Sequence, residues 1–536
     1  MKYPIKYGCK KHRHYQGTRS PTTDCETCDA VWAEIKANGG SRSRQRTPVP
    51  RVEGRVKVVG RQKLAKPKGN VIWRGLFSSA QNNTHIHDGL WVNLLALKKR
   101  HKADLFISRF TYNKAGHGTK AVKPGTLKAS DTQELWYDER IIPFVMDRSL
   151  QVAPGLVFCG EQNISPTASR PLSGLDSYTG RQSCMIPHVK LAMDSVASGK
   201  FEPTKFMYTT GTVTVRNYIQ KKAGLKAQFH HCYGALLVEV NSDGDWWVRQ
   251  LNADSDGTLY DWDLRVKDGK VTTGHRVEAV TWGDWHVPSN DPVVTDLAYR
   301  KGGIVDQLRP KYQFMHDIDD FRARSHHDRK DPHKKFRRYV EGRDLVEQEI
   351  QLVADFLHKA HRPWMETVVV DSNHDQALSR WLREADFRDD PPNALFYLRT
   401  SLALYGAIAR HDKDFHVLEH AVKSYYKNCA ATFLREGQSF VICPDANGGI
   451  QCGEHGDLGP GGRPGTDMTF SKLGRKVNRG HPHKASIYDG VYTVGCGCLL
   501  DMEWNRGQSA WSHTFTLTYE NGKRTHVTIW NGKEKA

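Results

Sequence analysis

The first half of the chain shows the spacing of apolar and polar residues that predicts an α/β structure. Residues 70–79 (NVIWRGLFSS) and 103–112 are expected strands, and residues 87–102 between them form an amphipathic helical pattern. Residues 205–215 and 234–240 are further predicted strands. A strand, a helix and a second strand in this order are typical of an α/β layer.

The second half repeats this alternation. Short apolar runs at 277–282, 312–316 and 366–370 are separated by helical stretches, notably 342–361, and residues 376–435 form a largely helical block. Strands that alternate with helices in this way favour βαβ units with a parallel sheet.

The length of 536 residues exceeds the size at which one hydrophobic core keeps growing, so we expect several domains. The tail from 513 to 530 predicts a β-hairpin with Asn521-Gly522 at the turn. The predicted segments are 1–34, a small cysteine-containing unit; 35–69, a basic linker; 70–275, an N-terminal α/β domain; 276–505, a second α/β domain; and 506–536, the C-terminal hairpin.

Composition adds a polyanionic partner to this picture. The chain has 78 Lys and Arg against 59 Asp and Glu, a formal net charge of +19, and such an excess favours nucleic acid. The N-terminus lacks the apolar core of a signal peptide, and no run of about 18 apolar residues occurs that could span a membrane. Eleven scattered cysteines indicate a reducing cytosol rather than a secreted disulfide scaffold. We expect a soluble cytoplasmic protein.

The N-terminal segment contains four residues with the spacing of zinc ligands. Cys9 and His12 form one pair, and Cys25 and Cys28 form the other. Two such pairs can surround one tetrahedral Zn²⁺, so we predict a structural zinc site in which His14 is an alternative to His12. The competing interpretation is a set of unrelated cysteines near a flexible terminus.

Candidate metal ligands also follow the apolar runs of the second half. Asp284 and His286 stand two positions apart where a predicted strand ends, and such side chains point to the same face. Open α/β sheets gather their ligands at the carboxyl ends of strands. The later candidates occur in a fixed order: Asp317; Asn373, His374 and Asp375; His455, after the predicted strand 439–443; and His481 and His483. One such motif alone is expected by chance among 26 histidines, but the ordered series indicates a metal site.

This series resembles the signature of the calcineurin-like metallophosphoesterases, which is Asp-x-His, Gly-Asp, Gly-Asn-His-Asp or Glu, an isolated His, and Gly-His-x-His. The resemblance covers roughly residues 276–500. The Asp-Trp-His at 284–286 and the Asn-His-Asp at 373–375 look most like the SbcD-type DNA nucleases. Protein phosphatases of this superfamily usually have Gly and Glu where this chain has Val287 and Asp375. His316 and Ser372 depart from the family pattern because they replace glycines, although neither stands at a ligand position.

The resemblance implies a four-layer α/β/β/α sandwich for residues 276–505 and a dinuclear metal centre. Asp284, His286 and His483 would hold one ion, Asn373, His455 and His481 the other, and Asp317 would bridge both. The mixed nitrogen and oxygen ligands suit Mn²⁺, Fe, Zn²⁺ or Mg²⁺, with Mn²⁺ expected from the nuclease branch. The family role of His374 is that of general acid for the leaving oxygen, and Asp375 would hold its imidazole and raise its pKa.

More loosely, the whole chain is similar to DNA-degradation proteins of large tailed phages of the T5 kind. The similar segments are residues 78–89 (SSAQNNTHIHDG), 453–465 and 479–492. This resemblance implies a phage protein that degrades host DNA in the host cytoplasm. Nucleases of this type commonly self-associate, so a homo-oligomer is expected as well.

Basic residues between the second and third motifs are candidate DNA contacts, since cations hold the phosphates that flank a scissile bond. These are Arg322, Arg324, Arg329 and Lys330; the alternative is a solvated helix start. Residues 70–275 can contribute a DNA clamp, an oligomerisation platform or a surface for a separate protein, and for His85 and His87 within them we favour a structural role. Two other functions stay open, a phosphomonoesterase or protein phosphatase with the same metals, and a DNA-binding protein with an inactive phosphoesterase domain.

Overall fold

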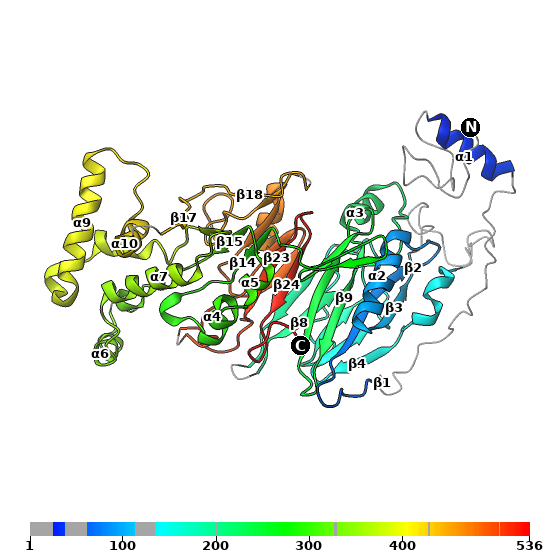
Figure 1. Cartoon of the computed structure of the whole chain (residues 1–536), viewed down its shortest axis with the longest axis horizontal. Coiled ribbons are helices and arrows are strands. Elements are labelled where there is room, and N and C mark those ends of the chain that lie inside the picture. Colours follow the sequence, from blue (N-terminus) through cyan, green and yellow to red (C-terminus); the bar gives the residue numbers. More distant parts are fainter. Residues whose placement is uncertain are drawn as a thin grey trace, which may run out of the picture.

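The computed structural model describes residues 25–37, 62–112, 135–199, 202–325, 328, 330–426, 429–446, 448–502 and 504–536. In these residues the strands form four hydrogen-bonded sheets, and helices lie on the outer sides of the stack (Figure 1). The protein is therefore mixed α/β, as the hydrophobic pattern predicts.

A six-stranded sheet carries the predicted βαβ units. Its strand order is β17-β16-β15-β14-β23-β24. Strands β14 to β17 are parallel, and β23 joins them by pairing antiparallel with β14. The turn at Asn521-Gly522 connects β23 to β24, so the predicted hairpin is confirmed as the edge of this sheet rather than as a separate unit. The strands are β14 (Ala279–Thr281), β15 (Tyr312–Met315), β16 (Glu366–Val369), β17 (Thr432–Phe433), β23 (Thr514–Thr518) and β24 (Arg524–Thr528).

Helices pack on one face of the six-stranded sheet because their apolar residues recur at helical spacing. Helix α7 (Val346–Ala360) buries Ile350, Val353 and Leu357 on one side, in one core with Trp285 beneath it. The predicted helix at 342–361 and the helical block at 376–435 are both confirmed. The other helices of this part are α4 (Pro292–Tyr299), α5 (Ile304–Leu308), α6 (Pro332–Val340), α8 (Ala377–Glu384), α9 (Ala394–Ala409) and α10 (Val417–Tyr425).

The second sheet has eleven strands in the order β1-β4-β5-β6-β8-β7-β21-β22-β20-β19-β18. Its two halves come from distant parts of the chain and meet where Met193 of β7 pairs with Ile487 of β21. The predicted boundary at 275 therefore does not divide this sheet. The strands are β1 (Gln62–Lys63), β4 (Ser149–Ala153), β5 (Leu156–Cys159), β6 (Ser183–Ile186), β7 (Met193–Val196), β8 (Lys205–Thr209), β18 (Val441–Ile442), β19 (Ile450–Gln451), β20 (Lys476–Arg479), β21 (Ser486–Tyr488) and β22 (Val491–Thr493).

A third sheet, of four strands, covers the eleven-stranded one. Its order is β10-β9-β2-β3, and Phe77 and Leu236 from it share one core with Phe158 and Tyr492 of the larger sheet. Helix α2 (Asp88–His101) crosses between the parallel strands β2 and β3 and covers the far face. The layers are thus helices, three successive sheets and a helix. The four-stranded sheet and α2 lie before residue 275, outside the residues 276–505 for which a four-layer sandwich is expected. The strands are β2 (Trp73–Gln81), β3 (Asp104–Phe110), β9 (Gly234–Val240) and β10 (Trp246–Asn252).

The predicted strand at 205–215 is only half correct. Strand β8 ends at Thr209, and beyond it Thr212 and Thr214 make isolated bridges to other segments. The remaining elements are the three-stranded sheet of β11 (Leu259–Asp261), β12 (Leu264–Lys267) and β13 (Lys270–Thr272), and the helices α3 (Lys222–His230), α11 (Asp467–Phe470), η4 (Glu139–Phe144), η5 (Val287–Ser289), η6 (Arg322–Arg324), η8 (Phe387–Asp389), η9 (Pro391–Asn393) and η10 (Ser471–Leu473).

Polar side chains join the two largest sheets behind the candidate site. Nδ2 of Asn478 on β20 donates to the hydroxyls of Thr281 and Thr518 at 3.1 and 3.2 Å. Buried Arg524 on β24 donates to the carbonyl oxygen of Val477 and to Asn478 Oδ1, both at 2.8 Å. Buried hydrogen bonds of this kind fix the register of one sheet on the other, since a slip would leave these polar groups unpaired.

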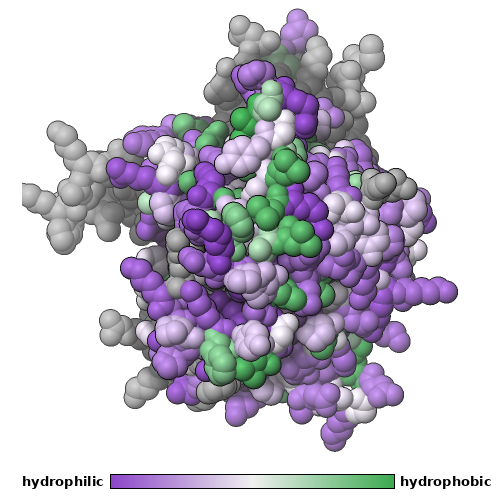
Figure 2. All heavy atoms as spheres, turned by 90° about the vertical axis from the view of Figure 1, so that its left-hand side faces the viewer, coloured by the Kyte–Doolittle hydropathy of each residue, from purple (hydrophilic) through white to green (hydrophobic). Residues whose placement is uncertain are grey.

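Helix α9 lies at one end of the molecule (Figure 1), and it carries an exposed apolar face. Leu395, Leu398, Leu402 and Tyr405 are between 47 and 75% exposed, and Ile408 is 60% exposed. The view onto this end shows hydrophobic side chains gathered in a band between hydrophilic ones (Figure 2). An apolar patch of this kind on a protein surface indicates an interaction site.

The N-terminal segments differ in part from the predicted zinc unit and linker. Helix α1 (Glu26–Ala37) contains buried Cys28, and Cys25 precedes it. Cys9 and His12 lie outside the described residues, so the zinc site stays a prediction. Within the predicted linker, Gln62 and Lys63 form β1 and pair with β4. In the described part of the chain, no helix is both long and apolar enough to cross a bilayer.

Candidate metal centre

The candidate ligands converge at the carboxyl ends of the central parallel strands. Asp284 and His286 follow β14, Asp317 follows β15, and Asn373 follows β16. His455 comes after the predicted strand at 439–443, of which Val441–Ile442 form β18, but a further strand, β19, lies between them and ends four residues before His455. His481 and His483 follow β20 and complete the set from the facing sheet.

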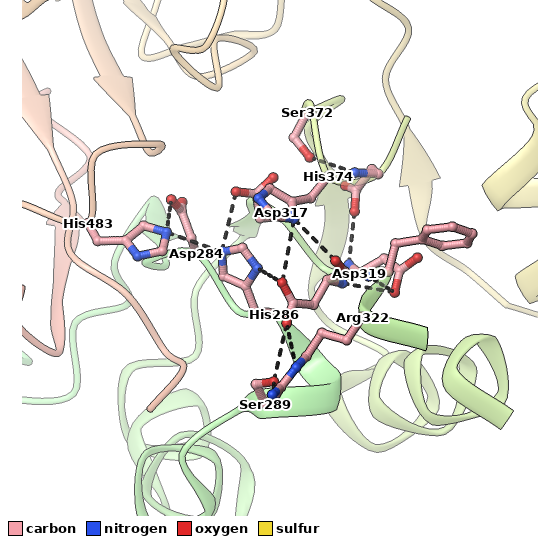
Figure 3. Close-up of polar contacts among 12 residues, drawn as sticks. Asp284, His286, Ser289, Asp317, Asp319, Arg322, Ser372, His374 and His483 are labelled. Atoms are coloured by element: carbon pink, nitrogen blue, oxygen red, sulfur yellow. Dashed lines mark hydrogen bonds and ion pairs between the residues drawn. The ribbon is translucent and has the colours of Figure 1, made fainter. Parts of the chain in front are cut away.

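Four of these residues form a tight first cluster (Figure 3). Ligand atoms of Asp284, His286, Asp317 and His483 all lie within 4.8 Å of one another, and all four residues are buried. Nε2 of His483 is 3.1 Å from Nε2 of His286 and 3.0 Å from Oδ2 of Asp284, and Nε2 of His286 is 3.5 Å from Oδ2 of Asp317. Two imidazoles and two carboxylates at these separations can hold one divalent cation.

Asp317 connects this cluster to a second group. Its Oδ2 atom, which faces His286, is also 3.3 Å from Nε2 of His455. The ring centroid of His455 is 5.2 Å from that of His481, and a second combination of ligand atoms joins His455 to Asp284 and His316. The carboxylate of Asp317 therefore lies between the two predicted ligand sets, as a bridging ligand would.

The backbone at the candidate ligands is unusual. His286, Asp317, His481 and His483 have positive φ values of 41°, 43°, 83° and 54°. Such conformations cost free energy in residues other than glycine and cluster at functional sites. Gly480, just before His481, is required for close approach because an added Cβ atom would lie 2.2 Å from Oδ1 of Asp284.

Several buried atoms of the candidate ligands have no hydrogen-bond partner among the described residues. Whether a cation fits the site can be judged from these atoms. They are Oδ1 of Asp284, Oδ1 of Asp317, Oδ1 of Asn373 and both ring nitrogens of His455. Buried polar atoms in native proteins are nearly always paired. Oxygen and imidazole atoms left unpaired in one place have the chemistry of a divalent metal site, so these residues fit such an ion.

The charges of the cluster compensate one another. Burial alone would raise the pKa of Asp284, but the hydrogen bond and charge of His483 outweigh it and leave this pKa at about 2. Burial alone would lower the pKa of His286, but Asp320, Asp317 and Asp284 raise it to about 10. Asp317 likewise raises the pKa of His455 to about 9 against the effect of burial. The carboxylates thus create a strongly cation-attracting environment.

His374 lies beside the first cluster, but its partner differs from the expected one. Its ring centroid is 4.6 Å from that of His286 in an edge-on contact, and its side chain is 24% exposed. Nδ1 of His374 is 3.3 Å from the carbonyl oxygen of Asp320 and 3.5 Å from its Oδ1. Burial lowers the pKa of His374. The prediction that Asp375 holds this imidazole is wrong, since Asp320 does so.

Asp375 instead shapes the loop after β15. Its Oδ1 accepts a hydrogen bond from the backbone N–H of Asp319 at 2.9 Å, and its own N–H donates to Ser372 Oγ. Burial and the nearby charge of Asp317 raise the pKa of Asp375 well above its usual range. Asp375 does not hold the imidazole of His374 because its hydrogen bond with Asp319 turns its carboxyl toward the loop.

Asp320 is the residue that sequence reasoning missed. Its Oδ1 lies 3.1 Å from Nδ1 of His286, and its Oδ2 accepts a hydrogen bond from Ser289 at 3.2 Å. Asp320 thus orients a candidate ligand and His374 together. The available signal is the run His316-Asp-Ile-Asp-Asp320, in which three carboxylates follow one strand and only the first, Asp317, matches the family motif.

The predicted DNA-contacting residues differ in their surroundings and in whether their charge is already paired. Arg322 lies at the site, where Nη1 donates to Ser289 Oγ and Nε is 3.6 Å from Oδ2 of Asp320. Arg324 forms a bidentate ion pair with Asp390, with both distances 2.6 Å, so its guanidinium is already engaged. Lys330 is exposed, and Arg329 lies outside the described residues.

His85 and His87 have the structural role favoured for them. His87 caps helix α2, where Nδ1 accepts a hydrogen bond from the N–H of Leu90 at 3.1 Å. His85 lies 3.6 Å from Oδ2 of Asp138. Capping of a helix N-terminus by a side chain is a common stabilising contact.

Residues 496–511 lie against the first cluster. Asp284 pairs with Cys496 as an isolated bridge, and Cys498 has its thiol within 4.8 Å of ligand atoms of His286 and His483. The ring centroid of Trp511 is 4.1 Å from that of His483. Sequence reasoning assigned no role to this segment, which carries no family motif.

These features define the class of protein: a mixed α/β chain with a buried cluster of histidines and carboxylates that can bind a divalent metal. No family model matches the chain. The chain is 39% identical over 474 residues to Protein A1 of Escherichia phage T5, which covers 86% of this chain and 82% of that protein. The chain therefore belongs to the family of this phage protein.

Proposed function

We propose that the protein is a metal-dependent DNA nuclease of the calcineurin-like metallophosphoesterase class, with a dinuclear centre. The observation that carries the proposal is the position of Asp317, whose Oδ2 lies 3.5 Å from Nε2 of His286 and 3.3 Å from Nε2 of His455. One carboxylate between two sets of ligand atoms suits two cations that act on one phosphodiester.

Asp284, His286, His483 and Asp317 would hold one ion, and Asn373, His455 and His481 would complete the second site with Asp317. Two bound cations, with Mn²⁺ the first choice and Fe, Zn²⁺ or Mg²⁺ as alternatives, would stabilise the charge on the phosphate oxygens and lower the pKa of a water molecule. The paired sheets β14–β17 and β18–β22 with outer helices are consistent with the core of the expected sandwich.

In this mechanism, His374 and Arg322 would act on the substrate directly. His374 would donate a proton from Nε2 to the leaving oxygen, since its Nδ1 faces the carbonyl oxygen of Asp320. Arg322, beside Asp320, would bind a phosphate oxygen of the substrate. Because the net charge of +19 favours a polyanion, DNA is the proposed substrate. Since the related Protein A1 belongs to a phage, the proposed place of action is the host cytoplasm and the proposed target is host DNA.

We also propose that the protein self-associates through α9. The exposed residues Leu395, Leu398, Leu402 and Tyr405 follow one another at intervals of three, four and three, which is the a/d spacing of a coiled coil. This seam contains no charge, so a second copy of the same helix is its natural complement across a two-fold axis.

The deciding experiment is incubation of circular and linear double-stranded DNA with the full-length protein in EDTA, Mg²⁺ or Mn²⁺, beside the Asp317→Ala variant. We expect Mn²⁺-dependent loss of DNA with the unsubstituted protein alone, and cleavage of the circle would show that no ends are needed. Turnover of p-nitrophenyl phosphate without cleavage of either DNA would overturn the proposal in favour of a phosphomonoesterase. Lack of bound metal together with salt-sensitive DNA binding would favour a binding protein with an inactive domain.

A further inference from the structure

Trp504 is an exposed aromatic residue beside the first ligand cluster. Its ring centroid is 6.4 Å from that of His286 and 6.0 Å from that of His483, and both histidines are buried. The tryptophan itself is 49% exposed. A large apolar ring that lies next to buried ligands and still faces solvent is available to a molecule bound at the metal centre.

The neighbouring rings are not stacked in parallel on this indole. Trp504 contacts Trp511 at 5.0 Å with an interplanar angle of 67°, and it meets His286 and His483 at 62° and 61°. Every one of these contacts is edge-on, so no parallel ring among them covers a face of Trp504. Because the indole is also 49% exposed, a flat ligand ring can reach it.

The loop that carries Trp504 is held in place at both ends. The N–H of Met502 donates to Asn505 Oδ1 at 2.9 Å, and Asn505 Nδ2 donates to the carbonyl oxygen of Leu500 at 2.8 Å. Farther along, Ser509 pairs with Ser198 through two backbone hydrogen bonds of 2.9 and 3.0 Å. An aromatic ring that is positioned before binding costs little entropy when a ligand stacks on it.

We propose that Trp504 forms a nucleobase subsite, which stacks on an unpaired base of the nucleotide whose phosphate occupies the metal centre. The inference rests on the proposed nuclease function and specifies its substrate class. Bases inside a duplex are stacked on their neighbours, so an indole at this distance from the ligands selects a frayed end or a single strand. Arg506, two residues later, is exposed and would supply a cation for an adjoining phosphate.

The test compares binding of a thymidine decamer and of an abasic decamer with the same backbone. Measuring both in the His374→Ala background with added Mn²⁺ keeps the metal centre that would hold the phosphate and slows cleavage by about 10²- to 10⁴-fold. We expect the thymidine decamer to bind about tenfold more tightly than the abasic one, which corresponds to stacking of one base. Adding Trp504→Ala should bring this ratio close to one, whereas Trp504→Phe should retain most of it. Phe229→Ala is the matched control, because Phe229 is an 83% exposed aromatic residue on α3.

A preference for thymidine that survives Trp504→Ala would overturn the base subsite, and so would a failure of both decamers to bind. Free thymidine monophosphate is added as a competitor, because a free nucleotide could also supply the base that stacks on Trp504. If it competes as strongly as the decamer, the subsite takes nucleotides rather than a DNA strand, and the inference fails. The two proposals fail separately: a protein that shows the base preference but never cleaves DNA contradicts the nuclease, while a nuclease whose single-strand cleavage is indifferent to Trp504→Ala contradicts the subsite.

Discussion

The Oδ1 atom of Asp320 lies 3.1 Å from Nδ1 of His286, which leaves Nε2 of that imidazole facing Asp317 and His483. The same oxygen is 3.5 Å from Nδ1 of His374. One buried carboxylate therefore orients a candidate metal ligand and the proposed proton donor. Carboxylates that hold the far nitrogen of a ligating histidine fix its tautomer and its ring orientation.

Replacement of Asp320 by asparagine is expected to weaken metal binding by about 10- to 100-fold, because the neutral amide lacks the negative charge that holds the imidazole of His286 in its orientation. Titration of the metal-free protein with Mn²⁺, followed by calorimetry, would measure the change. Asp375→Asn is the matched control. Burial raises the pKa of Asp375 well above its usual range, so an uncharged amide replaces this carboxyl with a smaller effect. A larger loss of affinity in the control would show that Asp375 is the orienting residue after all.

His374→Ala is expected to retain both metal ions and to lose about 10²- to 10⁴-fold in the rate of cleavage, since the general acid would be missing. Single-turnover cleavage of a labelled oligonucleotide measures the rate, and metal content is determined on the same preparation. Full activity in this variant would remove His374 from the mechanism. Loss of bound metal would instead make it a ligand.

The exposed seam on α9 predicts a concentration-dependent mass above that of the monomer in sedimentation velocity. Leu402→Glu places a charge in the centre of that seam and should shift the protein to a monomer. Leu352→Glu on α7 is the matched control, because Leu352 is 51% exposed but lies outside the seam. If the unsubstituted protein is monomeric at all concentrations, self-association through α9 is rejected. The exposed seam would then bind a different partner.

Local patterns predicted much of this structure, and the errors arise where distant contacts decide. The strands before Asp284, Asp317 and Asn373 were visible as apolar runs, and the candidate ligands after them kept a recognisable order. The eleven-stranded sheet was not visible, because its halves join at the pairing of Met193 with Ile487, which are far apart in the sequence. No local pattern encodes such a pairing.

The choice between Asp320 and Asp375 shows the same limit within the site. Asp375 is adjacent to His374 in the sequence, whereas Asp320 is 54 positions away and reaches His374 only after β15 and β16 pair. Hydrogen bonding to the backbone of Asp319 turns Asp375 aside. Proximity in the chain was therefore a poor guide to which carboxylate contacts the imidazole.

Arg249 on β10 forms a buried ion-pair network within residues 70–275, to which the sequence assigns no single role. Its Nε and Nη2 donate to the two oxygens of Asp261 at 2.6 and 3.1 Å, and its Nη1 donates to Glu239 Oε2 at 2.8 Å. Arg249→Met would leave two buried carboxylates without this partner, so we expect it to destabilise the protein by about 3–5 kcal/mol in urea unfolding. Arg300→Met is the control: its pair with Asp296 is exposed, and a change of at most about 1 kcal/mol is expected.

The same network predicts how stability depends on pH. Burial alone would raise the pKa of Glu239, but Arg249 and Arg74 outweigh it and lower this pKa from 4.5 to about 2. Because the folded value is the lower one, the contribution of this carboxylate, about 3 kcal/mol, is present above pH 4.5 and is lost as the pH falls toward 2. Glu239→Gln should therefore flatten the decline of the unfolding free energy between pH 5 and about 3. An unchanged slope in this variant, measured by urea unfolding at several pH values, would show that other carboxylates govern the acid stability of the fold.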